Sequence, residues 1–263
     1  MAESTNNNRI TRQQLKALAW MATLLVGAMV VLSAVNHRKS AAVKGVEVEI
    51  KPLPNGDLLM QPVDVTELIH KAFGYEFQSR SVRTVEIERL EQVLEKDPLV
   101  QDAEVFLDAR DYVRVTVTQR EPVIRIIDKD GWNYYLDKNG IRMPLSKHFT
   151  ARVVVATGSI PAYVPDFLER EKHLLRQLFL LSNDLRNDAF LNAMIGQIFV
   201  SSNGDFILAP LIGDQKIVFG KYDEDAKEKI QNLKIFYREA MPYEGWRKYR
   251  SIDVRFRGQV ICK

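Results

Sequence analysis

Two acidic loops closed by glycine have the spacing that most resembles a site for chemistry. Asp-Lys-Asp-Gly occupies residues 128–131, and Asp-Lys-Asn-Gly follows at residues 137–140. A calcium-binding EF-hand loop needs oxygen ligands at its positions 1, 3 and 5, a glycine at position 6 and a glutamate at position 12. In the first loop the glycine comes at position 4 and position 12 is Asn139. The spacing therefore argues against a cation site.

The sequence around these loops predicts turns instead. Val123–Ile127, Trp132–Leu136 and Ile141–Leu145 are short runs rich in residues that favour strands. Asp-Gly and Asn-Gly join them, and these pairs are favoured in tight hairpin turns that require a positive φ. We predict a β-meander over this stretch, with no bound metal.

Other residue types with catalytic potential lack the spacing that catalysis needs. The chain has four histidines, at residues 37, 70, 148 and 173. None of them has the spacing of a zinc site. Neither a nucleophile elbow nor a phosphate-binding loop occurs. Ser201-Ser202-Asn203 resembles one element of penicillin-binding enzymes, but no serine has a lysine three residues later. Glu121, before Pro122, is the strand-end acid that one would test for catalysis. These patterns indicate a binding module without cofactor, metal or catalytic site, although sequence alone does not exclude a buried pair of carboxylates.

Composition sets broader limits on function. Hydrophobic residues make up 46% of the chain and charged residues 27%, which predicts a folded core for most of its length. The net charge is +3, and no basic run is longer than His37-Arg38-Lys39. Nucleic-acid binding is therefore not expected. Cys262 is the only cysteine, so no disulfide can form within the chain.

One segment predicts a membrane anchor. Ala17–Val35 has no charged residue, and as a helix it would be about 28 Å long, close to the roughly 30 Å hydrocarbon core of a bilayer. A cleaved signal peptide is the alternative, but its apolar region is shorter and Ser33-Ala34-Val35 is a poor cleavage site. We expect a retained span over residues 14–36 after a polar, disordered tail at residues 1–13. Basic residues flank both ends, so charge alone does not orient the span.

The segment after the span predicts a small α+β unit over residues 43–119. Alternation and helical periodicity, with Thr84 as an N-cap, give the order strand, helix, helix, strand, strand. Two helices over one face of a three-stranded sheet would make this unit compact. The expected elements are Gly45–Lys51, Val63–Phe73, Thr84–Lys96, Gln101–Leu107 and Tyr112–Thr118.

Residues 120–263 predict a β-rich unit with two helices. The helices are expected at Asp166–Leu181, opened by Pro165, and at Asp223–Tyr237. Beyond the meander, the expected strands are Ala151–Ala156, Ile195–Val200, Phe206–Leu208, Lys216–Phe219 and Ser251–Cys262. The fold class is therefore α+β, behind one N-terminal transmembrane helix.

Three stretches in this order resemble a known bacterial family. Thr116–Pro122 (TVTQREP) is similar to its V-x-E-R-x-P boundary, although Thr118 and Gln119 stand where an acid is common. Tyr135–Gly140 (YLDKNG) is similar to its Y-x-D-x-x-G hairpin, and Ile252–Phe256 (IDVRF) to its V-D-L-R-Y strand. Together, after a single span, they resemble the FtsQ/DivIB cell-division family, and most closely FtsQ of the Bacteroidota type.

The resemblance implies a function and a location. It implies a POTRA domain at residues 43–119 and a β-rich domain at residues 120–263. Both would lie in the periplasm, held to the cell inner membrane by one span with a cytoplasmic N-terminus. The chain would be a scaffold that recruits FtsB and FtsL and links early division proteins to septal peptidoglycan synthesis. It would have no catalysis, no cofactor, no small-molecule substrate and no nucleic acid. A membrane-anchored hydrolase of the cell envelope stays open as the alternative.

The final strand is the expected partner site, because a last strand often lies at a sheet edge with unpaired backbone groups. Its alternation predicts one face made of Ile252, Val254, Phe256 and Val260, and an opposite face made of Asp253, Arg255, Arg257 and Gln259. Gly258 would leave room for a second backbone. The arginines suggest an acidic residue on the partner. The resemblance implies that FtsB adds here as a strand, on positions matching Arg255, Phe256 and Gly258.

Overall fold

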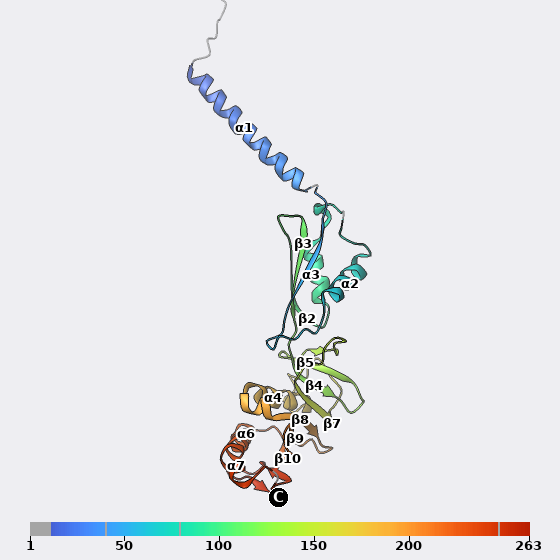
Figure 1. The fold of residues 1–263 in the computed structure, drawn as a ribbon, viewed down its shortest axis with the longest axis vertical. Helices are drawn as coiled ribbons and strands as arrows, with labels where there is room; N and C mark the ends of the chain where they lie inside the picture. Colours follow the sequence, from blue (N-terminus) through green and yellow to red (C-terminus); the bar gives the residue numbers. More distant parts are fainter. Residues whose placement is uncertain (1–11, 40, 79, 247) are drawn as a thin grey trace, which may run out of the picture.

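A computed structural model describes residues 12–39, 41–78, 80–246 and 248–263, without the side chains of residues 12–19 and 34–39 and of Arg83. Residues 1–11 of the predicted disordered tail lie outside the described residues. Figure 1 shows a long helix at one end, two folded units behind it along the long axis, and the C-terminus at the far end.

The N-terminal helix α1 (Arg12–Lys39) is 28 residues long and contains the predicted span. Its described side chains, from Trp20 to Ser33, are exposed. Figure 1 shows it projecting away from the two folded units. Counted over the residues that are described, no helix has the length and hydropathy to cross a membrane.

The first unit has the predicted strand-helix-helix-strand-strand order. It consists of β1 (Gly45–Lys51), α2 (Pro62–Phe73), the short 3-10 helix η1 (Val82–Thr84), α3 (Ile87–Glu95), β2 (Val100–Leu107) and β3 (Tyr112–Gln119). The strands are arranged β1-β3-β2, with β1 parallel and β2 antiparallel to β3. Alternate valines of β3 are buried against leucines of α3, which gives this unit its own core. The predicted N-cap was wrong: Thr84 lies in η1, and the residue before α3 is Glu86.

The second unit is built on one nine-stranded sheet, in the order β12-β11-β10-β9-β8-β7-β4-β5-β6. Its strands are β4 (Pro122–Ile127), β5 (Asn133–Asp137), β6 (Arg142–Met143), β7 (Val154–Gly158), β8 (Ile195–Val200), β9 (Phe206–Pro210), β10 (Lys216–Gly220), β11 (Ser251–Asp253) and β12 (Ile261–Cys262). Its helices are α4 (Leu174–Asn187), α5 (Ala189–Met194), α6 (Ala226–Ile235), the π-helical turn η2 (Phe236–Ala240) and α7 (Met241–Glu244). In Figure 1, α4, α6 and α7 lie on the same side of the strands.

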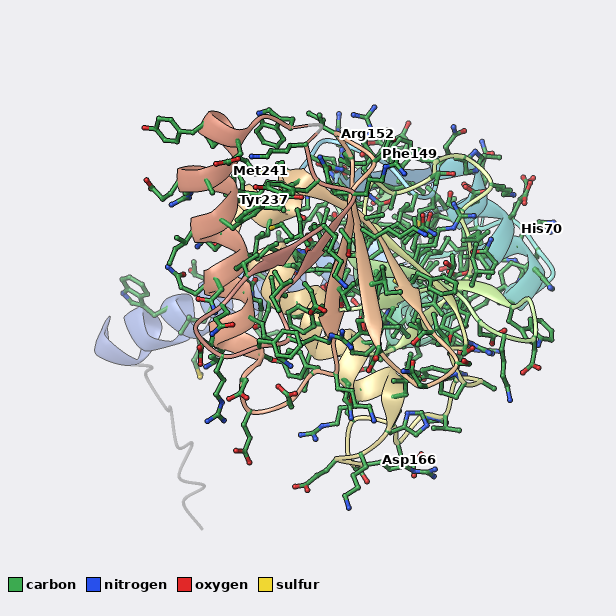
Figure 2. All side chains as sticks on the ribbon, turned by 90° about the horizontal axis from the view of Figure 1, so that it is seen from below. His70, Phe149, Arg152, Asp166, Tyr237 and Met241 are labelled. Atoms are coloured by element: carbon green, nitrogen blue, oxygen red, sulfur yellow. The ribbon has the colours of Figure 1, made fainter. Side chains whose placement is uncertain are left out.

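One continuous core lies between these helices and the sheet. Leu178 and Leu181 of α4, and Leu233 and Tyr237 at the end of α6 and in η2, pack against the inward face of the strands. Figure 2 shows Tyr237 and Met241 pointing from the η2–α7 segment towards the sheet. Both of these side chains are buried.

The predicted helix Asp166–Leu181 was wrong in its first half. Residues 165–173 form turns, and α4 begins only after His173, whose Nδ1 accepts the Leu175 N–H at 3.2 Å. Phe167 still reaches the core, but from a turn and not from a helix. The strand expected at Ala151–Ala156 begins three residues later, as β7, and the short helix α5 was not predicted.

The two units meet at a polar and an apolar contact. Within the first unit, the Gln119 side chain at the end of β3 accepts the Leu59 N–H at 2.5 Å and donates to the Lys51 carbonyl at 2.9 Å, beside the second unit. Arg120, the next residue, reaches Asp137 of β5 at 2.8 Å. Beside them lies a small apolar cluster of Leu53, Leu59, Tyr135, Met143 and Ala151. Side chains of both units are therefore buried together where the chain passes from one to the other.

Candidate partner-binding surface

The two acidic loops are turns, as predicted. Gly131 and Gly140 have φ of 85° and 76°. One carboxylate oxygen of Asp128 accepts the N–H groups of Asp130 and Trp132, both at 2.9 Å. Asp137 repeats this arrangement with the two equivalent N–H groups of its own loop, at 2.9 and 2.7 Å. These carboxylates therefore stabilise the backbone of the meander.

The other candidates for chemistry also have structural partners. Glu121 pairs with Arg186 of α4. His148 Nε2 lies 2.7 Å from an Asp64 carboxylate oxygen across the junction of the two units. The Ser201 hydroxyl lies in a turn and bonds Asn203 and Asp205. Among the described residues, no three histidine, cysteine or acidic side chains are grouped as metal ligands. No observation therefore favours the hydrolase alternative.

The predicted final strand is a hairpin and not one strand. β11 is parallel to β10 and covers only Ser251–Asp253, and residues 254–260 turn the chain back to β12. The break has a physical cause: Asp253 Oδ1 accepts the Arg255 N–H at 3.1 Å, and Gln259 N–H bonds the Phe256 carbonyl at 3.3 Å. These local bonds bend the backbone out of the sheet.

The predicted alternation holds only where the chain stays in the sheet. Ile252 and Val254 are buried, and Val260 packs against the core. Phe256 was expected on the same face but is 48% exposed, because it lies in the turn. Asp253, Arg255, Arg257 and Gln259 are all at least partly exposed, as expected.

The two arginines of the turn are paired within the chain. Arg255 pairs with Asp253 at 2.7 Å, and Arg257 pairs with Asp225, the residue before α6, at 2.6 Å. The Arg255 hydrogen bond lowers the pKa of the Asp253 carboxyl below its usual value, and Arg257 does the same for Asp225. The alkyl chain of Arg255 lies over Gly220, where an added Cβ would come within 2.8 Å of it. A partner acid would therefore have to compete with carboxylates that these arginines already bind.

Gly258 closes the turn. Its φ is 64°, in the left-handed region that favours glycine, and its N–H donates to Glu228 Oε1 at 2.9 Å. An added Cβ would meet no atom within 4 Å, so the space around it is open as predicted. The role of Asp225 and Glu228 was missed, because they are about thirty residues away in sequence and nothing at the start of α6 marks them as partners of this turn.

β12 forms the edge of the sheet. Lys263 exchanges both backbone bonds with Ser251, donating at 2.9 Å and accepting at 3.1 Å. The alternation of an antiparallel pair then turns the N–H and C=O of Cys262 to the open side. Ile261 is 38% exposed beside them. Elsewhere in this unit, Tyr243 of α7 is 88% exposed and Trp246, in the loop after α7, is 44% exposed. The edge of β12 therefore combines open backbone groups with the partly exposed side chain of Ile261.

Comparison with known proteins gives two matches. The family described as FtsQ/DivIB, C-terminal related, matches residues 121–263, more than half of the chain. The protein named Cell division protein FtsQ from Rhodothermus marinus is 28% identical over 174 residues. That alignment covers 64% of this chain and 62% of the relative, so the chain spans less than two thirds of the relative's length.

Proposed function

The chain belongs to the FtsQ/DivIB family, which gives it a role in cell division, and from this premise we propose that it is a non-catalytic scaffold that recruits FtsB and FtsL. It would link early division proteins to septal peptidoglycan synthesis. The observation that carries the proposal is the open edge of β12, at the end of the nine-stranded sheet and inside the matched region.

The recognition would use the backbone first. A segment of FtsB adding beside β12 would pair with the open N–H and C=O of Cys262 and cover Ile261. The arginines at 255 and 257 hold the turn that leads into β12, because both are paired with acids of this chain. Their expected role as binders of a partner acid stays part of the proposal, and that acid would compete with Asp253 and Asp225 for them.

The proposal includes a membrane anchor. α1 is 28 residues, or about 42 Å, long and contains the uncharged run of residues 17–35. We place this run in the inner membrane, with the N-terminus in the cytoplasm. The first unit, as a POTRA domain, and the β-rich unit would lie in the periplasm.

Photo-crosslinking in cells tests the proposal. The full chain would carry a benzophenone amino acid in place of Ile261, or in place of Trp132 as a matched control. Trp132 is 67% exposed in the same unit but lies in the meander, which is on the opposite half of the sheet from β12. The expected result is an FtsB adduct at position 261 and none at position 132. Equal adducts at both positions, or none at 261 in dividing cells, would contradict the proposal.

A further inference from the structure

The first unit has two sheet edges that differ in how they are closed. On β2, the outward Val105 N–H donates to Glu91 Oε1 of α3 at 2.9 Å, so a side chain blocks this edge. At the other edge, β1, no described side chain bonds the outward backbone groups between Gly45 and Glu49. The backbone N–H of Val105 points away from β3, so the N–H and C=O of Val115, which lies opposite it, point towards β1. Val115 lies opposite Val48 in the parallel pair with β1. The backbone N–H and C=O groups of Val46 and Val48 therefore point to the open side of β1.

An apolar groove lies beside this open edge. A cavity of about 470 Å³ separates the start of β1 from α2 and from the segment 75–78 that follows it. Its apolar lining comes from Val46, Val63, Ile69, Tyr75 and Phe77. Val46 and Val48 point towards the helices but are only partly buried, and Val63 of α2 is 53% exposed. The groove therefore has room for apolar side chains of a strand that pairs with β1. Figure 2 shows His70 of α2, another lining residue, at the outer side of the molecule.

The charge around the edge indicates the chemistry of an occupant. Glu47 and Glu49 alternate with the valines of β1, and both are exposed on the face away from the helices. Arg114 of β3 pairs with Glu47 at 2.8 Å, whereas Glu49 lies opposite Thr116. Glu67 and Glu76 line the groove as well, with Lys71 as the one cation in its described lining. Opposite charges on neighbouring strands are favourable and like charges are not, so this edge favours a basic strand.

We propose that the edge of β1 binds an extended, basic segment of a partner protein as a fourth strand. Apolar residues at every second position of that segment would enter the groove between β1 and α2. Lysine or arginine residues between them would lie beside Glu47 and Glu49. This surface is in a different unit from the β11–β12 hairpin, and the proposal does not depend on the recruitment of FtsB.

A peptide-binding measurement tests this proposal. The probe is a fluorescein-labelled peptide of alternating lysine and valine, titrated by anisotropy with the full chain in detergent micelles. Glu49→Lys should weaken binding by roughly fivefold or more, because it replaces an attractive cross-strand neighbour with a repulsive one. The matched control is Glu104→Lys. Glu104 is exposed and lies opposite Thr116 of β3, as Glu49 does on the other side. It belongs to β2, however, whose outer edge is blocked by Glu91. This control should bind the peptide as the wild type does.

A second peptide separates strand addition from simple charge attraction. It has the same composition, with the lysines and valines sorted into two blocks, so it cannot place one face in the groove. We expect this peptide to bind at least about fivefold more weakly to the unchanged chain. Equal binding of both peptides, equal effects of Glu49→Lys and Glu104→Lys, or no binding of the alternating peptide would each overturn the proposal.

Discussion

At the scale of single residues, the two meander turns have the same backbone hydrogen bonds but differ in their side-chain contacts. Asp128 and Asp137 each hold two backbone N–H groups, and Asp137 also binds Arg120 at 2.8 Å. Arg120 in turn donates to the Val100 carbonyl of the first unit at 2.9 Å. The sequence predicts both turns from Asp-Gly and Asn-Gly. It does not show that only the second carboxylate also joins the two units, because its cation comes from outside the repeat.

This difference predicts unequal costs for the same substitution. Asp137→Ala should lower the free energy of unfolding by about 3 kcal/mol, because it leaves a largely buried guanidinium and two N–H groups without their partner. Asp128→Ala removes only the N–H partners and should cost about 1–2 kcal/mol. Urea unfolding of the two variants measures this directly. Equal losses would show that the Arg120 pair does not contribute.

The two glycines of the same turns give a second matched comparison. Gly140→Val should destabilise the chain more than Gly131→Val does. Both have positive φ, which costs about 1–3 kcal/mol for a β-branched residue. At Gly140 a Cβ would also come within 2.8 Å of Leu168 and 2.9 Å of Phe167, whereas at Gly131 it meets nothing within 4 Å. Thermal unfolding of both variants gives the order, and the reverse order would contradict the packing around Gly140.

At the scale of elements, the β2–β3 hairpin has a defined response to acid. The Tyr112 N–H bond, followed by bonds from Arg110 and Arg114, lowers the pKa of Asp108 from its usual value to about 2. A lowered pKa in the folded state means that this stabilisation is present above the ordinary pKa near 4 and is lost as the pH falls through about 2. Asp108→Asn should therefore show a smaller fall in melting temperature between these two pH values than the wild type. An identical fall in both proteins would contradict the role given to Asp108.

The sequence predicts correctly those strands and turns whose own residues have a clear local pattern. The valines of β3 alternate and the meander has two marked turns, so both appear where expected. The predictions were wrong where distant or side-chain contacts decide the structure. Phe167, Leu174 and Leu178 fall in the predicted helix 166–181 and all three reach one core, but only the last two lie in a helix. Likewise, the hairpin at 254–260 depends on Asp225 and Glu228, whose contacts no local pattern reveals.

At the scale of the whole molecule, the structure separates two surfaces at opposite ends of the folded part. The edge of β1 is next to the end of α1, and the edge of β12 is at the C-terminus (Figure 1). Between them, Arg120 joins the two units through its contacts with Asp137 and with the Val100 carbonyl. An anchored chain of this form could hold one partner near the membrane and another far from it. Sequence alone did not show this arrangement, because it depends on contacts between distant residues, such as Asp64 and His148, which are 84 positions apart.

Recruitment of FtsB by the open edge of β12 is tested most directly by changing one backbone donor. Cys262→Pro removes an N–H that points away from β11, so no bond of the hairpin is lost, and proline is tolerated at such edge positions. Cys262→Ser is the matched control, because it keeps the N–H and a side chain of similar size. The measurement is calorimetric titration of each full-length variant, in detergent, with the periplasmic segment of FtsB. We predict unchanged affinity for Cys262→Ser and a loss of about tenfold or more for Cys262→Pro, with equal melting temperatures. Wild-type affinity in a folded Cys262→Pro variant would contradict the account.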